Sequence, residues 1–240
     1  MTEETIINNC IVRIRKPGNH IVPVAVIILL HGWTGDEKAM WVFAEQFPKD
    51  HLLVAHRGIF PAHSRGYGWH DGPVRAYPSV CDFKSSIKLI NQLLGTLRQM
   101  TKCPDDVILV GFSEGAALAY SYTIQFPGSI TKIAALSGFV PEGIQVYFDA
   151  KPFSGKKVFV THGIKDKLVP IERAREDREK LIELGAEIDY CEADVGHKLS
   201  VGCFKLLEKF IAQSNPCALR SATSMESPCG VGLCSPLLSQ

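Results

Sequence analysis

The chain has 240 residues, of which 46% are hydrophobic and 21% are charged, and these fractions exclude a wholly disordered chain. Its 26 Lys and Arg residues balance 25 Asp and Glu residues, so we expect no surface that neutralises nucleic-acid phosphates. The longest apolar run, residues 24–30, is too short for the roughly 20 residues that cross a membrane. No basic segment precedes an apolar stretch at the start, so we expect no secretory signal, no stable membrane insertion and a cytoplasmic protein.

Cysteine usage favours the same compartment. Five of the eight cysteines are scattered singly, which is typical of reduced thiols in a cytoplasmic protein: Cys10, Cys81, Cys103, Cys191 and Cys203. The others, Cys217, Cys229 and Cys234, form no CxxC zinc pair. No glycine-rich phosphate loop follows a strand either. The sequence therefore predicts no metal site and no cofactor.

Apolar runs and a helical pattern follow one another through the first part of the chain. Residues 6–15 predict one or two strands, and the β-branched run at 24–30 predicts a central strand buried on both faces. The spacing of apolar residues at 35–47 predicts a helix that ends before Pro48. Residues 52–55 predict the next strand.

A long loop rich in Gly, Pro and aromatic residues follows at 57–78, and loops of this length in compact domains are usually functional. Ser79, with Asp82 three positions later, predicts a capping box that starts a helix running to about residue 100. Further strands are expected at 107–110, 133–136, 157–160 and 188–191, and further helices at 114–126, 171–184 and 200–213.

This alternation of strands and helices predicts the fold class. It is typical of an α/β fold with a mostly parallel sheet covered by helices on both faces. We expect residues 1–214 to form a single catalytic domain. Residues 215–240 are rich in Ser, Pro, Gly and Cys without periodicity, so they predict a flexible tail.

The strongest chemical signal is Gly111-Phe112-Ser113-Glu114-Gly115, which lies between a predicted strand and an Ala-rich helix. A serine at such a sharp turn projects its hydroxyl above the sheet, and the flanking glycines avoid clashes in the turn. The helix N-terminus adds backbone N–H groups and the positive end of its dipole. The motif therefore predicts Ser113 as a nucleophile.

A serine nucleophile needs a base and an acid that orients the base. In proteins with this serine turn, the acid and then the histidine follow the serine along the chain. His197 follows the last predicted strand and is the expected base, whereas His162 is interpreted as a structural residue at a strand end. Asp166, just past a strand, is the expected acid. Asp194 and Glu192 are the competing acids.

Two backbone N–H groups are expected to stabilise the oxyanion that forms during acyl transfer. One belongs to the residue after the nucleophile, Glu114, and the other to the loop at 31–36, where Trp33 is the expected donor. We interpret His31, at the start of this loop, as a structural residue.

Taken in order, these motifs resemble the phospholipase/carboxylesterase group of α/β-hydrolase-fold serine esterases, which includes the acyl-protein thioesterases. The resemblance covers about residues 20–213. It rests on His31-Gly32-Trp33-Thr34-Gly35-Asp36, Arg57-Gly58-Ile59-Phe60-Pro61, Gly66-Tyr67-Gly68-Trp69, the Ser113 motif, His162-Gly163, Asp166 through Val169-Pro170, and Gly196-His197. It implies the same roles for Ser113, His197, Asp166, Trp33 and Glu114. It also suggests a homodimer.

Two positions depart from the pattern of this group. Many members carry Gln after the nucleophilic serine, where this chain has Glu114, and Leu where it has Trp33. A backbone donor survives both changes, but a carboxylate that points inward would disfavour negative charge on the oxyanion. We expect the differences to affect substrate preference more than reaction type.

We expect the pocket to be lined by Tyr67 and Trp69 from the long loop, and by Leu168 beside the predicted acid. The alternative is that the aromatic residues pack the loop onto the sheet. The connection at 138–155 is too short for a lid domain, and the large Trp33 and Trp69 rings would shorten a pocket. Short to medium acyl chains are therefore expected.

The sequence thus predicts a serine carboxylesterase that hydrolyses short- to medium-chain esters of small molecules through an acyl-enzyme intermediate. An acyl-protein thioesterase or a lysophospholipase would use the same residues with a longer acyl channel. A non-catalytic binding module on the same fold is the remote alternative, because a fold alone does not imply activity.

Overall fold

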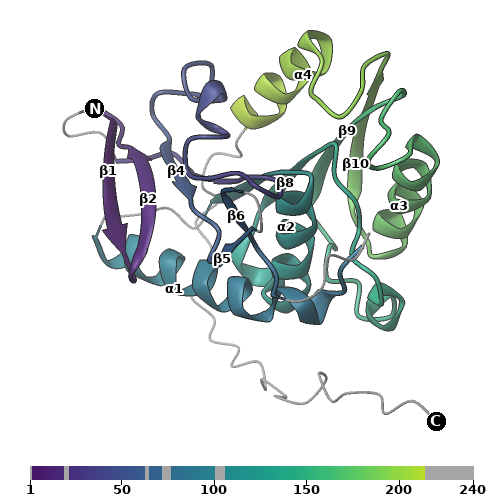
Figure 1. Cartoon of the computed structure of the whole chain (residues 1–240), viewed down its shortest axis with the longest axis horizontal. Helices are drawn as coiled ribbons and strands as arrows, with labels where there is room; N and C mark the ends of the chain where they lie inside the picture. Colours follow the sequence, from purple (N-terminus) through teal and green to yellow (C-terminus); the bar gives the residue numbers. More distant parts are fainter. Residues whose placement is uncertain (1, 19–21, 63–64, 72–76, 101–105, 214–240) are drawn as a thin grey trace.

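The computed structural model describes residues 2–18, 22–62, 65–71, 77–100 and 106–213, so the predicted tail lies outside the described residues. The strands of its main sheet are β1 (Thr2–Ile7), β2 (Cys10–Arg15), β3 (Val26–Leu30), β4 (Leu52–His56), β7 (Val107–Phe112), β8 (Lys132–Leu136), β9 (Lys157–Gly163) and β10 (Glu187–Ala193). Within the described ranges they form one eight-stranded sheet in the order β1-β2-β4-β3-β7-β8-β9-β10 (Figure 1). The six strands from β4 to β10 are parallel, which confirms the predicted α/β architecture.

The first two strands form an antiparallel hairpin at the edge of the sheet. Asn8 and Asn9 connect them with φ angles of 51° and 63°. A two-residue hairpin turn needs positive φ at both positions, and Asn tolerates this conformation. β2 also pairs antiparallel with β4, so the hairpin extends the parallel sheet.

Helices cover both faces of the sheet. They are α1 (Lys84–Met100), α2 (Glu114–Gln125), α3 (Ile171–Glu183) and α4 (Val201–Ala212). Alternate residues of the central strands point to opposite faces: Ile28 and Leu109 join the core beneath α1, α2 and α3, whereas Ile27 and Ile108 join the core beneath α4. Among the described helices, none is long and apolar enough to cross a membrane.

The start of α1 follows the predicted capping box. The Asp82 carboxylate accepts the backbone N–H of Ser79 at 2.8 Å. The Ser79 side chain accepts from the backbone of Asp82 in return, which completes the capping box. The first turn is a 3-10 helix, η2 (Val80–Phe83), and α1 continues from it. This helix start was therefore predicted correctly.

The predicted helix at 35–47 is wrong. The segment forms turns with one short 3-10 helix, η1 (Trp41–Phe43). The backbone N–H groups of Trp41 and Phe43 donate to the carbonyls of Lys38 and Met40, three positions back, so the segment forms 3-10 turns and not a continuous α-helix. The apolar residues that gave the helical spacing are nevertheless buried beneath the α4 side of the sheet: Met40, Ala44 and Phe47.

The prediction of reduced thiols is wrong for Cys81, Cys191 and Cys203 and correct for Cys10, whereas Cys103 lies outside the described residues. Cys191 in β10 and Cys203 in α4 form a disulfide with their Cα atoms 5.9 Å apart. Cys81 is disulfide-bonded as well, whereas Cys10 is a free thiol. Single spacing along the sequence does not exclude pairing, because the fold brings distant cysteines together. Disulfides persist mainly in oxidising compartments, so the cysteines no longer support the cytoplasmic expectation.

Candidate active site

Ser113 lies in the turn between β7 and α2, with φ 53° and ψ −116°. This backbone conformation is strained for a residue with a side chain. A Cβ atom on Gly111 would lie 2.3 Å from the Gly115 carbonyl oxygen, and one on Gly115 would lie 2.2 Å from the Leu30 carbonyl oxygen. The glycines of the motif are therefore required by close packing. The Ser113 N–H donates to the Leu136 carbonyl at 2.9 Å, which fixes the turn to β8.

Asp166 and His197 are hydrogen-bonded, with 2.7 Å between Asp166 Oδ2 and His197 Nδ1. The other carboxylate oxygen accepts the backbone N–H groups of Leu168 at 2.8 Å and Val169 at 3.0 Å. Burial raises the pKa of Asp166, but the bonds from Val169, His197 and Leu168 outweigh this effect and hold the pKa below its ordinary value. Asp166 is thus a fixed carboxylate that orients the imidazole of His197.

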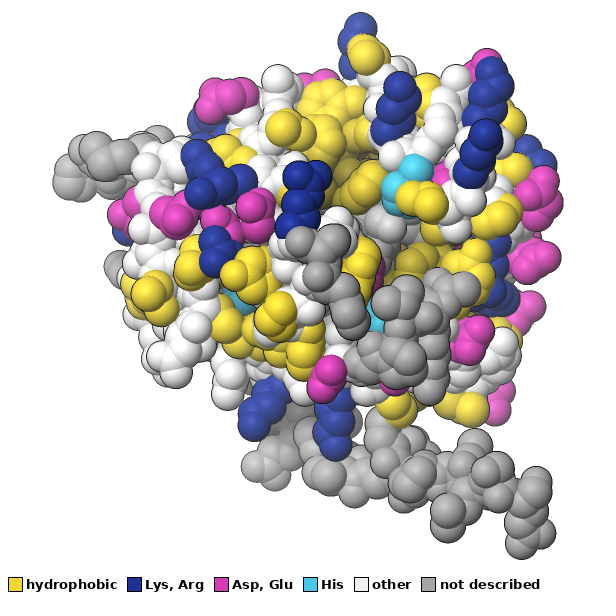
Figure 2. Space-filling model, viewed as in Figure 1, with side chains coloured by type: hydrophobic (Ala, Val, Ile, Leu, Met, Phe, Trp, Pro, Cys, Tyr) yellow, Lys and Arg dark blue, Asp and Glu magenta, His cyan; other side chains and the backbone are white. Residues whose placement is uncertain are grey.

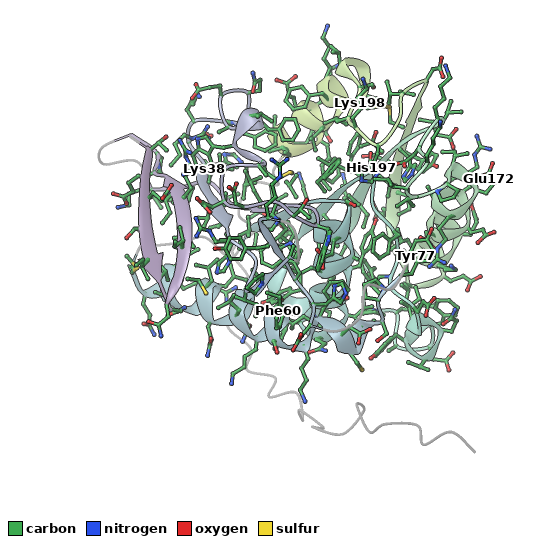
Figure 3. All side chains as sticks on the ribbon, viewed as in Figure 1. Lys38, Phe60, Tyr77, Glu172, His197 and Lys198 are labelled. Atoms are coloured by element: carbon green, nitrogen blue, oxygen red, sulfur yellow. A yellow bond between two sulfur atoms is a disulfide. The ribbon has the colours of Figure 1, made fainter. Side chains whose placement is uncertain are left out.

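The topology brings this pair to the edge of the sheet that carries Ser113. β7, β8, β9 and β10 are parallel neighbours, so their carboxyl ends meet at one edge, where ligands bind in α/β sheets. The His197 ring packs edge-on against Phe112, with 5.0 Å between the ring centroids, and Phe112 directly precedes Ser113. Figure 3 shows His197 on the connection that leads from β10 to α4.

The competing acids are bonded elsewhere. Asp194 pairs with Lys165 at 2.8 Å, and both side chains are 68% exposed. Glu192 accepts from Arg175 at 2.8 and 2.7 Å and from the Tyr190 hydroxyl at 2.9 Å. Of the acids considered from the sequence, Asp166 is the one bonded to His197.

His162 lies beneath the acid. Its side chain is fully buried, with Nε2 2.8 Å from the Val169 carbonyl oxygen and 3.3 Å from Asp166 Oδ2. This position matches the structural role expected for it. Within the described part of the chain, no group of three or more His, Cys, Asp or Glu is arranged to hold a metal ion.

The loop that carries Trp33 passes directly against the serine turn. A Cβ atom on Gly32 would lie 3.2 Å from Ser113 Cβ and 3.0 Å from the Phe112 ring. Thr34 has a φ of 67°, and the Gly35 N–H donates to the Gly32 carbonyl at 3.0 Å, so the loop turns tightly here. The backbone of Trp33 is therefore held beside Ser113, where the sequence expects an oxyanion donor.

His31 anchors this loop from below. The Gly58 N–H donates to His31 Nε2 at 2.8 Å, so Nδ1 carries the proton and donates to the Gly32 carbonyl at 2.7 Å. Burial lowers the pKa of His31, which keeps the ring neutral in this arrangement. The ring thus ties the loop to the segment that follows β4, in agreement with the structural role expected for it.

The side chain of Glu114 points towards the loop at 65–71 and is 4% exposed. Its Oε1 atom accepts the Trp69 N–H at 3.0 Å and lies 2.6 Å from His70 Nδ1. His70 belongs to none of the motifs that the sequence presents. The unusual Glu114 was the one available signal, and nothing in the spacing connects two residues that are 44 positions apart.

The expected pocket residues occupy different environments. Trp69 is completely buried, and its indole N–H donates to the His31 carbonyl at 2.7 Å, so the prediction that its ring lines the pocket is wrong. The alternative, packing of the loop onto the sheet, describes it correctly. Tyr67, in the short strand β6 (Tyr67–Gly68), is half-buried beneath the Arg57 guanidinium, 4.9 Å from the ring centroid. Leu168 is 72% exposed.

Exposed apolar side chains flank the Asp166 segment. Ile164 and Leu168 lie on either side of Asp166 in the sequence, and Ile164 is 45% exposed. Val201, at the start of α4, is 76% exposed. Figure 2 shows hydrophobic side chains gathered next to α4 on the viewed face, with Lys and Arg side chains around them. This surface offers apolar contacts near the Asp166–His197 pair.

Known proteins resemble the chain in sequence and in fold. The family model described as phospholipase/carboxylesterase matches residues 13–215. Acyl-protein thioesterase 1 of Kluyveromyces lactis is 30% identical over 167 residues, which cover 61% of this chain and 72% of that protein. A probable inactive carboxylesterase of Oryza sativa subsp. japonica is 25% identical over 213 residues, which cover 78% and 85%. A carboxylesterase structure from Mesorhizobium loti has a TM-score of 0.74 at 18% identity, covers 88% of this chain and 99% of its own, and supports the fold alone.

Proposed function

The chain belongs to the phospholipase/carboxylesterase family, and from this premise we propose that it is a serine hydrolase that cleaves carboxylic esters through an acyl-enzyme intermediate. The observation that carries the proposal is the combination of a strained Ser113 turn with a buried Asp166–His197 pair at the same sheet edge. A structural serine would gain nothing from the strain, and strained backbone of this kind clusters at active sites. Family membership supports an esterase or thioesterase, and these residues support the reaction type.

In the first half of the reaction, Ser113 Oγ attacks the acyl carbonyl carbon, while His197 Nε2 takes the hydroxyl proton. Asp166 stabilises the imidazolium that forms. The backbone N–H groups of Trp33 and Glu114 donate to the oxyanion. As the tetrahedral intermediate collapses, the bond to the leaving alcohol breaks and His197 returns the proton to that oxygen.

In the second half, water attacks the acyl group on Ser113. His197 takes a proton from the water, and the same N–H groups hold the second oxyanion. Collapse releases the carboxylic acid, and the proton on His197 returns to Ser113 Oγ. Every proton is therefore carried by one histidine.

We further propose that the substrates are esters of small molecules with short to medium acyl chains. The exposed Leu168 and Ile164 offer an apolar contact surface, and the half-buried Trp33, whose ring lies against Gly68 and His70, follows the Gly32 that contacts Ser113. Trp69 no longer supports this proposal, because its ring is buried. The Kluyveromyces lactis relative makes a thioesterase acting on acylated proteins the second candidate.

The test is hydrolysis of p-nitrophenyl esters from C2 to C16 by the wild type and by Ser113→Ala, with a palmitoyl-thioester peptide in parallel. In a related triad, loss of the nucleophile costs on the order of a millionfold in kcat. We expect Ser113→Ala to be folded and inactive, and kcat/KM of the wild type to stop rising by about six to eight carbons. If kcat/KM keeps rising to C16 and the peptide is turned over, the short-chain esterase is rejected in favour of the thioesterase.

The rice relative is named as a probable inactive carboxylesterase, so the test must also be able to identify a non-catalytic member of the family. Absence of turnover by the wild type on every ester and thioester, together with no labelling by a fluorophosphonate probe, would identify this chain as such a member. Labelling at Ser113 with slow turnover would instead indicate an unsuitable substrate set.

A further inference from the structure

A second carboxylate–imidazole pair lies behind the serine turn, apart from Asp166 and His197. Glu114 and His70 are 4% and 7% exposed, and 2.6 Å separates Glu114 Oε1 from His70 Nδ1. The same carboxylate oxygen accepts the Trp69 N–H at 3.0 Å. The proposed mechanism uses the backbone N–H of Glu114 and leaves its side chain without a role.

His70 contacts both residues that are proposed to hold the oxyanion. Its Nδ1 atom bonds the side chain of Glu114, and its ring lies 5.4 Å from the Trp33 ring, centroid to centroid. On its other side the ring packs edge-on against Phe83 at 5.9 Å. Gly68 contacts both Trp33 and Glu114, because a Cβ atom on it would lie 2.2 Å from the Trp33 ring and 3.3 Å from Glu114 Oε2. Trp33, Gly68, Glu114 and His70 are therefore in one tightly packed cluster.

The position of the carboxylate creates an electrostatic problem. A negative charge on the residue that follows Ser113 opposes the negative charge that develops on the substrate oxygen, and the buried surroundings screen it little. A buried carboxylate needs hydrogen-bond donors to be tolerated at all. The Trp69 N–H and the His70 ring are the two partners that Oε1 has among the described residues.

We propose that His70 is a positioning residue for the oxyanion hole, acting through Glu114. The His70 ring is hydrogen-bonded to the Glu114 carboxylate, holds it turned towards residues 69–70, and supports the ring of Trp33. This inference rests on the proposed function, because it assigns a role in the same acyl transfer. Neither residue reacts with the substrate.

The proposal predicts how changes at the two positions combine. His70→Phe keeps a ring against Trp33 and Phe83 but removes the partner of the carboxylate, so kcat should fall by about 30- to 100-fold with little change in KM. Glu114→Gln removes the carboxylate but keeps the backbone N–H and still accepts the Trp69 N–H, so its own kcat is the reference for the double variant. In the double variant no carboxylate is left for His70 to hold, so kcat should return to within about fivefold of the Glu114→Gln value.

The experiment is this double-mutant cycle, measured with a p-nitrophenyl ester on protein quantified by fluorophosphonate titration of Ser113. His56→Phe, alone and with Glu114→Gln, is the matched control. His56 is a buried histidine whose ring packs on Trp69, with 5.9 Å between the centroids, and its Nδ1 atom is hydrogen-bonded to the backbone carbonyl of Arg57 and not to Glu114. Glu114→Gln should not alter the effect of the control substitution on kcat.

Recovery of kcat in the double variant supports the proposal. A double variant as slow as His70→Phe, or an unchanged kcat in His70→Phe, would overturn it. If His70→Phe does not fold, His70→Gln takes its place, because its amide still donates to Glu114. It should lose about tenfold in kcat, again recovered by Glu114→Gln, and a loss that is not recovered would overturn the proposal. Failure of the wild type to label or turn over would concern the proposed function instead.

Discussion

At the scale of single residues, the proposed site separates the side chains proposed to react from the side chains that hold them. Ser113 and His197 are half-buried, as groups that meet a substrate must be. Asp166, His162 and His31 are buried beneath them and are bonded to backbone groups. Asp166 is fixed from both of its oxygens, so its direction towards His197 does not depend on the substrate.

The role of Asp166 gives the first prediction at this scale. Asp166→Asn should lower kcat by about three to four orders of magnitude, because an amide neither fixes the tautomer of His197 nor stabilises its imidazolium. Asp194→Asn is the control, since Asp194 pairs with exposed Lys165, and its kcat should be unchanged. Steady-state hydrolysis of a p-nitrophenyl ester measures both. The reverse order of effects would show that the acid is Asp194.

At the scale of elements, the proposed base, His197, lies on a connection between two of them. His197 lies between β10 and α4, and Cys191 in β10 is bonded to Cys203 in α4, twelve positions further along. The Ser200 hydroxyl accepts the Cys203 N–H at 3.1 Å and caps α4. The disulfide therefore closes the loop that carries the base at both of its ends.

The prediction for this loop concerns the pair Cys191→Ala and Cys203→Ala. Opening a loop of this length should lower the free energy of unfolding by about 3 kcal/mol. It should also lower kcat, because His197 loses a constraint on its position. Chemical denaturation and ester hydrolysis measure the two effects, with Cys10→Ala as the free-thiol control. Unchanged stability and kcat in the double variant would show that the disulfide has no role in holding the base.

Local patterns predicted most elements, and they failed where the structure depends on distant partners. The Ser79 capping box and the Ser113 turn are encoded by residues a few positions apart, so the sequence predicted them correctly. The segment at 35–47 has helical spacing but forms 3-10 turns that bury its apolar residues against the sheet, and the pairing of Cys191 with Cys203 depends on how β10 and α4 pack. Burial of Trp69 and the bond between His70 and Glu114 likewise depend on the tertiary fold.

At the scale of the whole molecule, buried neutral histidines couple the fold to pH. Burial lowers the pKa of His56 to about 4, and the hydrogen bond to the Arg57 carbonyl offsets only part of this effect. Burial also lowers the pKa of His31. Below the ordinary pKa of about 6.5, the unfolded chain binds protons that the folded chain excludes, so stability falls as the pH falls towards 4.

We therefore expect the free energy of unfolding to fall by about 2 kcal/mol between pH 8 and pH 5, because His56 binds a proton more readily in the unfolded chain. His56→Phe cannot bind a proton, so its loss of stability over this range should be smaller than that of the wild type by the same amount. Urea denaturation at the two pH values measures the difference. Equal losses of stability in the wild type and the variant would mean that His56 has the same pKa in the folded and the unfolded chain.

The most direct test of the central assignment is the identity of the acylated residue. The wild type is mixed with an activated short-chain p-nitrophenyl ester, quenched in acid within the first turnovers, and digested for peptide mass spectrometry. The account predicts an acyl group on Ser113, and its accumulation in Asp166→Asn should be much slower. Hydrolysis with an acyl group on another residue, or rapid turnover with no acyl group on Ser113 at any time, would contradict it.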